Sequence, residues 1–202
     1  MNGLKDDITK GYDNVANTFA KVLDPVKEAK KKLPVYDGTC PPVSVRPDLT
    51  HVSDFYNPSN SSEDTKISEA TITNVQNTCR VEDGRIIMQV DLSISGKTGP
   101  KARVKPSDKP SFAYPYFIAV TDSKGTIVSK DIFAASLSYS ANQNEGATTE
   151  TIFQNMPIPD TAAGEIFNVV VGFQLTNEQL SYNNAKLSAP INGQTNASYN
   201  AR

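Results

Sequence analysis

The stretch "IIMQVDLSIS", residues 86–95, decides the fold class of this chain. Apolar residues occupy every second position, and most of the positions between them are polar. Side chains of a β-strand point alternately to opposite faces of a sheet, so this alternation predicts a strand with one buried face. The residues predicted to face the core are Ile86, Met88, Val90, Leu92 and Ile94.

The residues before this strand predict its partner in an antiparallel hairpin. Their apolar positions are even at Ala70 and Ile72 but odd from Val75 to Val81. A change of parity inside one strand indicates a β-bulge, where one extra residue shifts the faces. An Asp-Gly pair at 83–84 separates the two strands and can supply the positive φ angles of a tight turn.

Short alternating segments joined by Gly, Pro, Asn and Asp turns continue to residue 175, and they predict a mainly β fold. About seven such strands favour an antiparallel β-sandwich of immunoglobulin or fibronectin type III character, with a small β-barrel as the alternative. After these strands, Thr176 and Gln179 have the spacing of a capping box, which predicts one or two helical turns. The predicted strands lie within 67–81, 86–95, 116–121, 127–128, 136–140, 149–159 and 165–175.

Composition divides the chain into four predicted parts. We expect an amphipathic helical arm over residues 1–33 and the β-sandwich domain over residues 67–184. Between them, residues 34–66 are rich in Pro, Ser and Asn and predict a linker, with one short edge strand at "PVSV". Residues 185–202 are polar and predict a flexible tail.

The arm carries apolar residues at alternating steps of four and three from Ile8 to Val26. This spacing places them along one side of an α-helix. Three roles fit such a stripe: packing on its own domain, docking to another protein, or lying on a membrane surface. We take docking as the working hypothesis, with contacts from Val15, Phe19, Val22 and Val26.

The sequence lacks the residue sets that most chemistry requires, so we predict no enzyme, no metal and no cofactor. The chain has one histidine, His51 in "LTHVSDFY", which is predicted to lie in a surface loop without a catalytic partner. Two isolated cysteines and one histidine do not supply a zinc site. The 20 basic residues are balanced by 22 acidic residues, which argues against nucleic acid as a partner.

Two local features suggest binding instead. Five cations cluster in the segment between two predicted strands, where they predict contact with lipid headgroups or an acidic partner, or else a solvated loop. Four aromatic residues suggest an alternative function, a stacking site for a glycan or other small ligand, unless they belong to the core. The cations are Lys97, Lys101, Arg103, Lys105 and Lys109, and the aromatic residues are Phe112, Tyr114, Tyr116 and Tyr139.

The two cysteines, Cys40 and Cys79, predict either a disulfide or two free thiols. Cys79 shares the parity of Val75 and Val81 and should face inward, while Cys40 precedes the predicted edge strand. A bond between them would attach the linker to the sandwich. It would also indicate an oxidising compartment, which means the periplasm or the cell exterior.

The chain contains, in this order, "CPPVSVRPD" at 40–48, Cys79, "TGP" at 98–100, "YPYFIAVTD" at 114–122 and "VGFQLTNEQLSYN" at 171–183. Together these motifs resemble small uncharacterised envelope lipoproteins of alphaproteobacteria, over roughly residues 40–184. The resemblance implies a periplasmic β-sandwich tethered to a membrane, with no established activity and no functional residues. At its start the chain departs from this pattern, because the helical arm stands where a signal and lipobox would be expected. We therefore expect a non-enzymatic accessory or structural subunit of an envelope assembly, docked through the arm to a protein partner.

Overall fold

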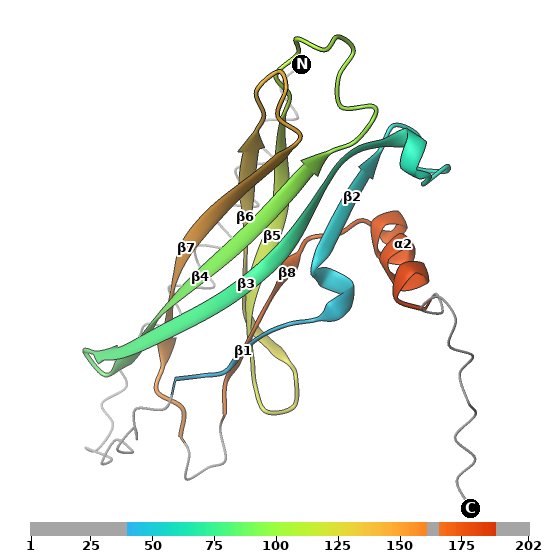
Figure 1. Ribbon diagram of the computed structural model, residues 1–202. Coiled ribbons are helices and arrows are strands. Elements are labelled where there is room, and N and C mark those ends of the chain that lie inside the picture. Colours follow the sequence, from blue (N-terminus) through green and yellow to red (C-terminus); the bar gives the residue numbers. More distant parts are fainter. Residues whose placement is uncertain (1–39, 161–165, 189–202) are drawn as a thin grey trace, which may run out of the picture. The chain divides into compact units, whose positions relative to one another are not determined.

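The computed structural model describes residues 40–160 and 166–188 (Figure 1). The chain divides into two units, Met1–Pro34 and Val35–Arg202, and the description below concerns the second. The predicted helical arm with Val15, Phe19, Val22 and Val26 lies outside the described residues, so its docking role stays a prediction.

The described residues form eight strands in two sheets of four. Neighbouring strands are antiparallel, except that β1 and β8 are parallel. In the view of Figure 1 the second sheet lies in front of the first. The first sheet has the order β1 (Val43–Val45), β8 (Asn168–Phe173), β5 (Ser111–Thr121) and β6 (Ile127–Ser138). The second has the order β2 (His51–Phe55), β3 (Lys66–Glu82), β4 (Arg85–Thr98) and β7 (Glu145–Pro157).

Both sheets contribute to one hydrophobic core. The five inward residues predicted on β4 are at most 1% exposed, so the strand prediction is confirmed. Alternate residues of β5 and β8 supply the opposite side of this core. The predicted mainly β class is therefore confirmed, and two sheets that share one core are what a β-sandwich requires. From the first sheet the core includes Tyr114, Tyr116, Ile118, Val169, Val171 and Phe173.

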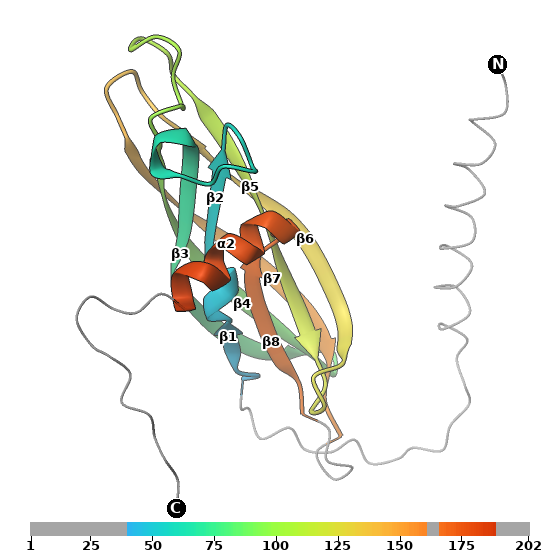
Figure 2. The ribbon, with the colours of Figure 1, turned by 90° about the vertical axis from the view of Figure 1, so that its right-hand side faces the viewer.

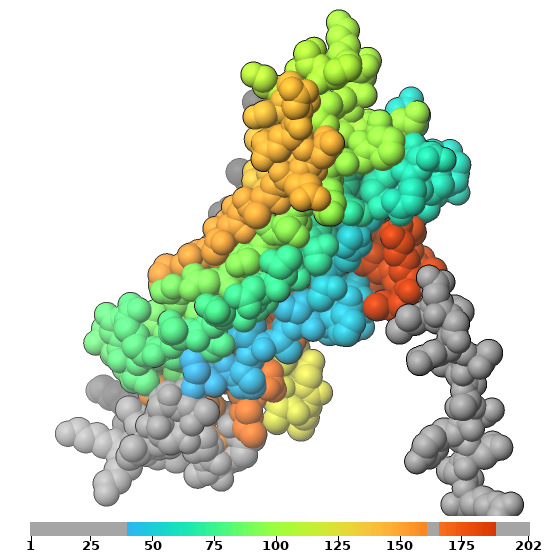
Figure 3. All heavy atoms as spheres, viewed as in Figure 1, coloured from blue at the N-terminus to red at the C-terminus, as the bar shows by residue number. Residues whose placement is uncertain are grey.

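The predicted hairpin and its bulge are also confirmed. The register between β3 and β4 shifts between Ile72 and Asn74, where the parity of the apolar residues changes. Asp83 and Gly84 have φ angles of 48° and 71°, the left-handed values that the tight turn needs. The long hairpin forms most of the surface seen in Figure 3, together with β7.

The linker prediction for residues 34–66 is wrong in part. The edge strand at Val43–Val45 exists, but His51–Phe55 forms a second strand, β2, and Val52 and Ser53 on it are buried. Of the two buried residues of β2 only Val52 is apolar, and the sequence on either side of the strand is rich in prolines and polar residues. The strand therefore shows no alternation of apolar and polar residues by which it could be predicted. Two short 3-10 helices complete this region, η1 (Pro47–Leu49) and η2 (Glu63–Thr65).

The helix that follows β8 is longer than predicted. It spans Asn177–Ser188 as α2, so residues 185–188 are helical, and the rest of the predicted tail lies outside the described residues. The capping box is confirmed, because the Thr176 N–H donates to Gln179 Oε1 at 2.8 Å and the Gln179 N–H donates to Thr176 Oγ1 at 3.2 Å.

Candidate functional site

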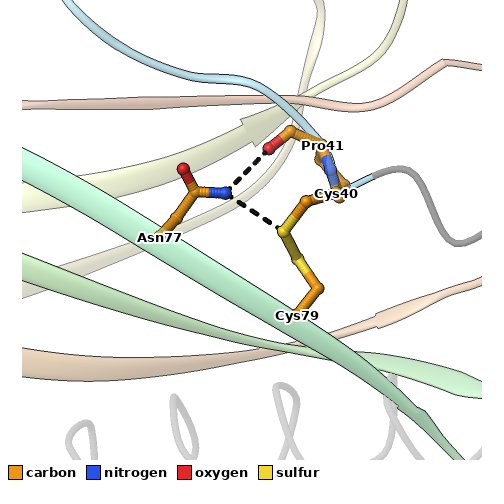
Figure 4. The surroundings of a disulfide bond; sticks show 4 residues. All are labelled: Cys40, Pro41, Asn77 and Cys79. Atoms are coloured by element: carbon orange, nitrogen blue, oxygen red, sulfur yellow. Dashed lines mark hydrogen bonds between the residues drawn. A yellow bond between two sulfur atoms is a disulfide. The ribbon is translucent and has the colours of Figure 1, made fainter.

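The predicted disulfide between Cys40 and Cys79 is present, with 5.6 Å between the two Cα atoms (Figure 4). It joins the segment before β1, in the first sheet, to β3 in the second. The Asn77 amide donates to Cys40 Sγ at 3.1 Å and to the Pro41 carbonyl at 3.4 Å. The bond is compatible with an extracytoplasmic protein, because disulfides persist in oxidising compartments.

The aromatic site predicted for a glycan is not formed, because its tyrosines belong to the core. Tyr114, Tyr116 and Tyr139 are at most 2% exposed, and Phe112 is partly buried against them. The alternation of β5 turns Tyr114 and Tyr116 toward the second sheet. Burial raises the pKa of Tyr116 to about 12, as expected for a hydroxyl removed from water.

The five predicted cations occupy the end of β4 and the loop after it, at the top of Figures 1 and 3, but two of them are already engaged. Lys97 forms an exposed ion pair with Glu145 at 2.8 Å. The Arg103 guanidinium donates to Asn144 Oδ1 at 2.9 Å and to the Ser140 carbonyl at 3.1 Å. Arg103 therefore ties two loops together, and the remaining three cations, Lys101, Lys105 and Lys109, are exposed.

His51 lies on β2 and is partly buried, in contrast to the predicted surface loop. Its Nε2 is 2.9 Å from Ser53 Oγ and 3.7 Å from Glu69 Oε2, and its Nδ1 is 2.9 Å from Thr71 Oγ1. A hydrolytic triad needs the serine on one ring nitrogen and the carboxylate on the other. Here both approach the same nitrogen, and Ser53 is only 1% exposed, so this arrangement does not form a triad.

A buried lysine connects this cluster to the rest of the molecule. Lys66 Nζ donates to Glu63 Oε2 and to Glu69 Oε2, each at 2.7 Å. From α2, the Tyr182 hydroxyl and Lys186 Nζ both reach Glu63 at 3.4 Å. The ion pairs satisfy the buried Lys66, and they hold η2, β3 and α2 together.

α2 covers the free edge of β2 (Figure 2). The Asn183 amide donates to the carbonyls of Asp48 at 3.0 Å and His51 at 2.6 Å, and the Gln179 amide donates to Asp54 Oδ1 at 2.8 Å. A cavity of about 210 Å³ lies beside Asp54. Burial raises the pKa of Asp54 even though Gln179 and Ser68 donate to its carboxylate. Helix and side-chain amides thus protect this edge from pairing with another chain.

The burial of His51 predicts a pH dependence of stability. Desolvation lowers the pKa of His51 from its ordinary value of 6.5, although nearby Glu69 acts in the opposite direction. The unfolded chain therefore binds more protons than the folded chain as the pH falls through 6.5, and the free energy of unfolding should decrease. Urea unfolding at about pH 7.5 and about pH 5.5 measures this loss, because carboxylates titrate mainly below that range.

His51→Gln is the control for this prediction, since His51 is the one histidine of the chain. The variant should show nearly the same stability at both pH values. An equal loss in the variant would show that another group causes the dependence.

The opposite side of the two sheets is open. β6 and β7 are the last strands of their sheets, and among the described residues no strand pairs with their outer edges. The first eight residues of β6, 127–134, are all exposed. A cleft of about 650 Å³ lies at the end of this side and is lined by residues of β5, β6, β7 and the segment before β8. Val128 and Ile166, which line the cleft, are each more than half exposed, as are Ile127 and Ile132 of β6 and Phe153 of β7.

Sequence reasoning missed this site, although one signal was available. "IVSKDIFA" at 127–134 is rich in β-forming residues but does not alternate between apolar and polar positions. A strand that is exposed on both faces needs no alternation. We therefore take the β6 edge and the cleft beside β7 as the candidate binding site.

Comparison of the chain with protein-family models, with curated proteins and with solved structures gave no match. Among the described residues no helix is long and apolar enough to cross a membrane. The same residues contain no group of three or more His, Cys, Asp or Glu side chains arranged to hold a metal ion. The site is therefore interpreted from its own geometry.

Proposed function

We propose that this chain is a non-enzymatic interaction module that serves as an accessory or structural subunit of a cell-envelope assembly. The observation that carries this proposal is the exposed apolar strip along β6, where Ile127, Val128 and Ile132 are 55–59% exposed. Contiguous apolar surface on an unpaired strand edge promotes association with another chain. A partner that covers the strip removes this apolar surface from water.

Two further points support the compartment and the architecture. The Cys40–Cys79 disulfide fits the periplasm or the cell exterior, and the resemblance to alphaproteobacterial envelope lipoproteins agrees with it. We interpret the two sheets as a β-sandwich of immunoglobulin or fibronectin type III character. The apolar stripe of the arm at Val15, Phe19, Val22 and Val26 remains our proposed second docking element, and a membrane surface is its alternative contact.

Affinity purification of the full chain from native envelope membranes tests the function. We expect one partner in a fixed stoichiometry with the wild type, and loss of most of it with Ile132→Asp. The control is Val104→Asp, which places the same charge on a residue that is 95% exposed in the basic loop. A chain that purifies from the membranes without any stoichiometric partner would contradict the proposal.

The arm is tested in the same experiment by Phe19→Asp. Its matched control is Asn17→Asp, because Asn17 falls on the side of the predicted helix opposite the apolar stripe. If both variants retain the partner, docking by the arm is wrong, while docking by the β6 edge is tested separately by Ile132→Asp.

A further inference from the structure

Among the described residues no strand pairs with the outer edge of β6, so this side of the two sheets offers main-chain hydrogen-bonding groups as well as apolar side chains. The edges of β6 and β7 lie on the same side of the two sheets, since the Gln154 amide of β7 donates to Asp131 of β6 at 3.3 Å. An unpaired edge presents a row of N–H and C=O groups at the spacing that another strand requires. At the other side of the second sheet α2 covers the edge of β2, so the two sides differ in what they can bind.

The cleft beside this edge can receive side chains. Its volume of about 650 Å³ lies within the usual range of ligand sites in proteins. Its apolar lining comes from both sheets and from the segment before β8. These lining residues are Val120, Val128, Met156, Pro157, Ile166 and Phe167. The two charged residues of the lining, Asp122 and Lys124, have opposite signs.

The two charges on the exposed part of β6 are held away from its edge. Lys130 Nζ lies 4.4 Å from the centre of the Phe117 ring and donates to Gln174 Oε1 at 2.8 Å, both within its own sheet. Asp131 accepts the bond from Gln154 across the gap between the sheets. Charged side chains commonly prevent edge pairing, but these two compensate each other and leave a neutral edge. An uncharged apolar strand is complementary to such an edge.

We propose that the β6 edge binds an extended, uncharged and mainly apolar segment of a partner protein by strand addition. The main chain of the segment pairs with residues 127–134, and its alternate side chains enter the cleft beside β7. This inference rests on the proposed function and specifies how the partner is recognised. A lipid would use the cleft without the main-chain edge, and a second copy of this chain would bring its own β6.

A displayed library of random 12-residue peptides, selected against the oxidised full chain, tests the proposal. We expect enriched peptides in which uncharged apolar residues recur at every second position, as a strand that fills the cleft from one face requires. Val128→Asp should weaken their binding about tenfold or more, measured by isothermal titration calorimetry. Val104→Asp is the control, because Val104 is 95% exposed in the loop after β4, at the opposite end of the second sheet from the cleft, and should change the affinity less than about twofold.

Backbone pairing is tested on the wild-type chain, so the result does not depend on the folding of a variant. The best peptide is synthesised in two forms that are N-methylated at alternate residues, in one phase or the other. Only one of the two N-methylated peptides should lose binding, because a strand presents alternate N–H groups to its neighbour. Hydrogen exchange should also slow at the amides of residues 127–134 in the complex.

Several results would overturn the proposal. These are failure to enrich any peptide, equal binding by Val128→Asp, and indifference to both N-methylation phases. A dimer of the wild type that Val128→Asp dissociates would assign the edge to a second copy, and binding of a fluorescent fatty acid that excludes the peptides would assign the cleft to lipid. A native partner that binds Val128→Asp and Ile132→Asp as well as the wild type would overturn this binding mode while leaving the proposed function in place.

Discussion

Replacing both Cys40 and Cys79 with alanine should lower the free energy of unfolding by about 3–4 kcal/mol. The bond closes a loop with a sequence separation of 39 residues, and it restricts the unfolded chain more than the folded one. It also ties the segment before β1 to β3, in the opposite sheet. Because β1 has only three residues, its parallel pairing with β8 depends on that attachment.

Urea unfolding of the double variant and of the wild type measures this effect. Reducing the wild type with dithiothreitol should reproduce most of the loss, which separates the effect of the bond from that of the substituted side chains. In both cases hydrogen exchange should show β1 losing protection before β4. A loss below about 1 kcal/mol would mean that the unfolded chain is already compact without the bond.

The second large effect is expected in the centre of the second sheet. Ile94→Ala should lower the free energy of unfolding by about 2–5 kcal/mol, since Ile94 is 1% exposed and its removal leaves a cavity in the shared core. Ile94 lies on β4, which is paired on both sides, so the surrounding strands have little freedom to close that cavity.

Ile87→Ala is the matched control, because it makes the same substitution on the opposite face of the same strand. Ile87 is only partly buried, and its replacement should cost about 1 kcal/mol or less. Chemical denaturation of both variants compares the two faces directly. Equal losses would contradict the assignment of the even-numbered face of β4 to the core.

These two predictions concern the scaffold, and the binding site depends on it. The disulfide and the core of β4 hold the two sheets together, while β6 and β7 form one edge of each sheet. Loosening the sheets should therefore change the cleft before it unfolds the chain. Reduced protein should bind the selected peptides more weakly than oxidised protein, even under conditions where both are folded.

Local features of the fold could be predicted because each depends on the identity of a few neighbouring residues. The β4 face follows from a period of two, the bulge at Ile72–Asn74 from a change of parity, and the turn from Asp83 and Gly84. The inward parity of Cys79 likewise made Cys40 a reasonable partner. In contrast, β2 was missed, because its five residues carry little alternation and its burial depends on β3 and α2.

The candidate site could not be predicted, because it arises from the order of strands in the sheets. Residues 127–134 are exposed because β6 is an edge strand, and the cleft exists because β7 is an edge strand on the same side. Similarly, Tyr114 and Tyr116, proposed for a glycan site, are core residues because β5 lies inside its sheet, where its alternate side chains meet the second sheet.

By itself, the sequence determined a mainly β protein, with one long bulged hairpin, a capped helix after the last strand and a pair of cysteines suited to a disulfide. These features depend on backbone preferences and on side-chain periodicity, which act over a few residues. Only the tertiary structure decided which strands lie at the edges, which aromatic residues are buried, and where His51, Lys66 and α2 meet. Those outcomes depend on pairing between residues far apart in the chain, such as β1 with β8. A local sequence pattern does not specify which strands become neighbours in a sheet.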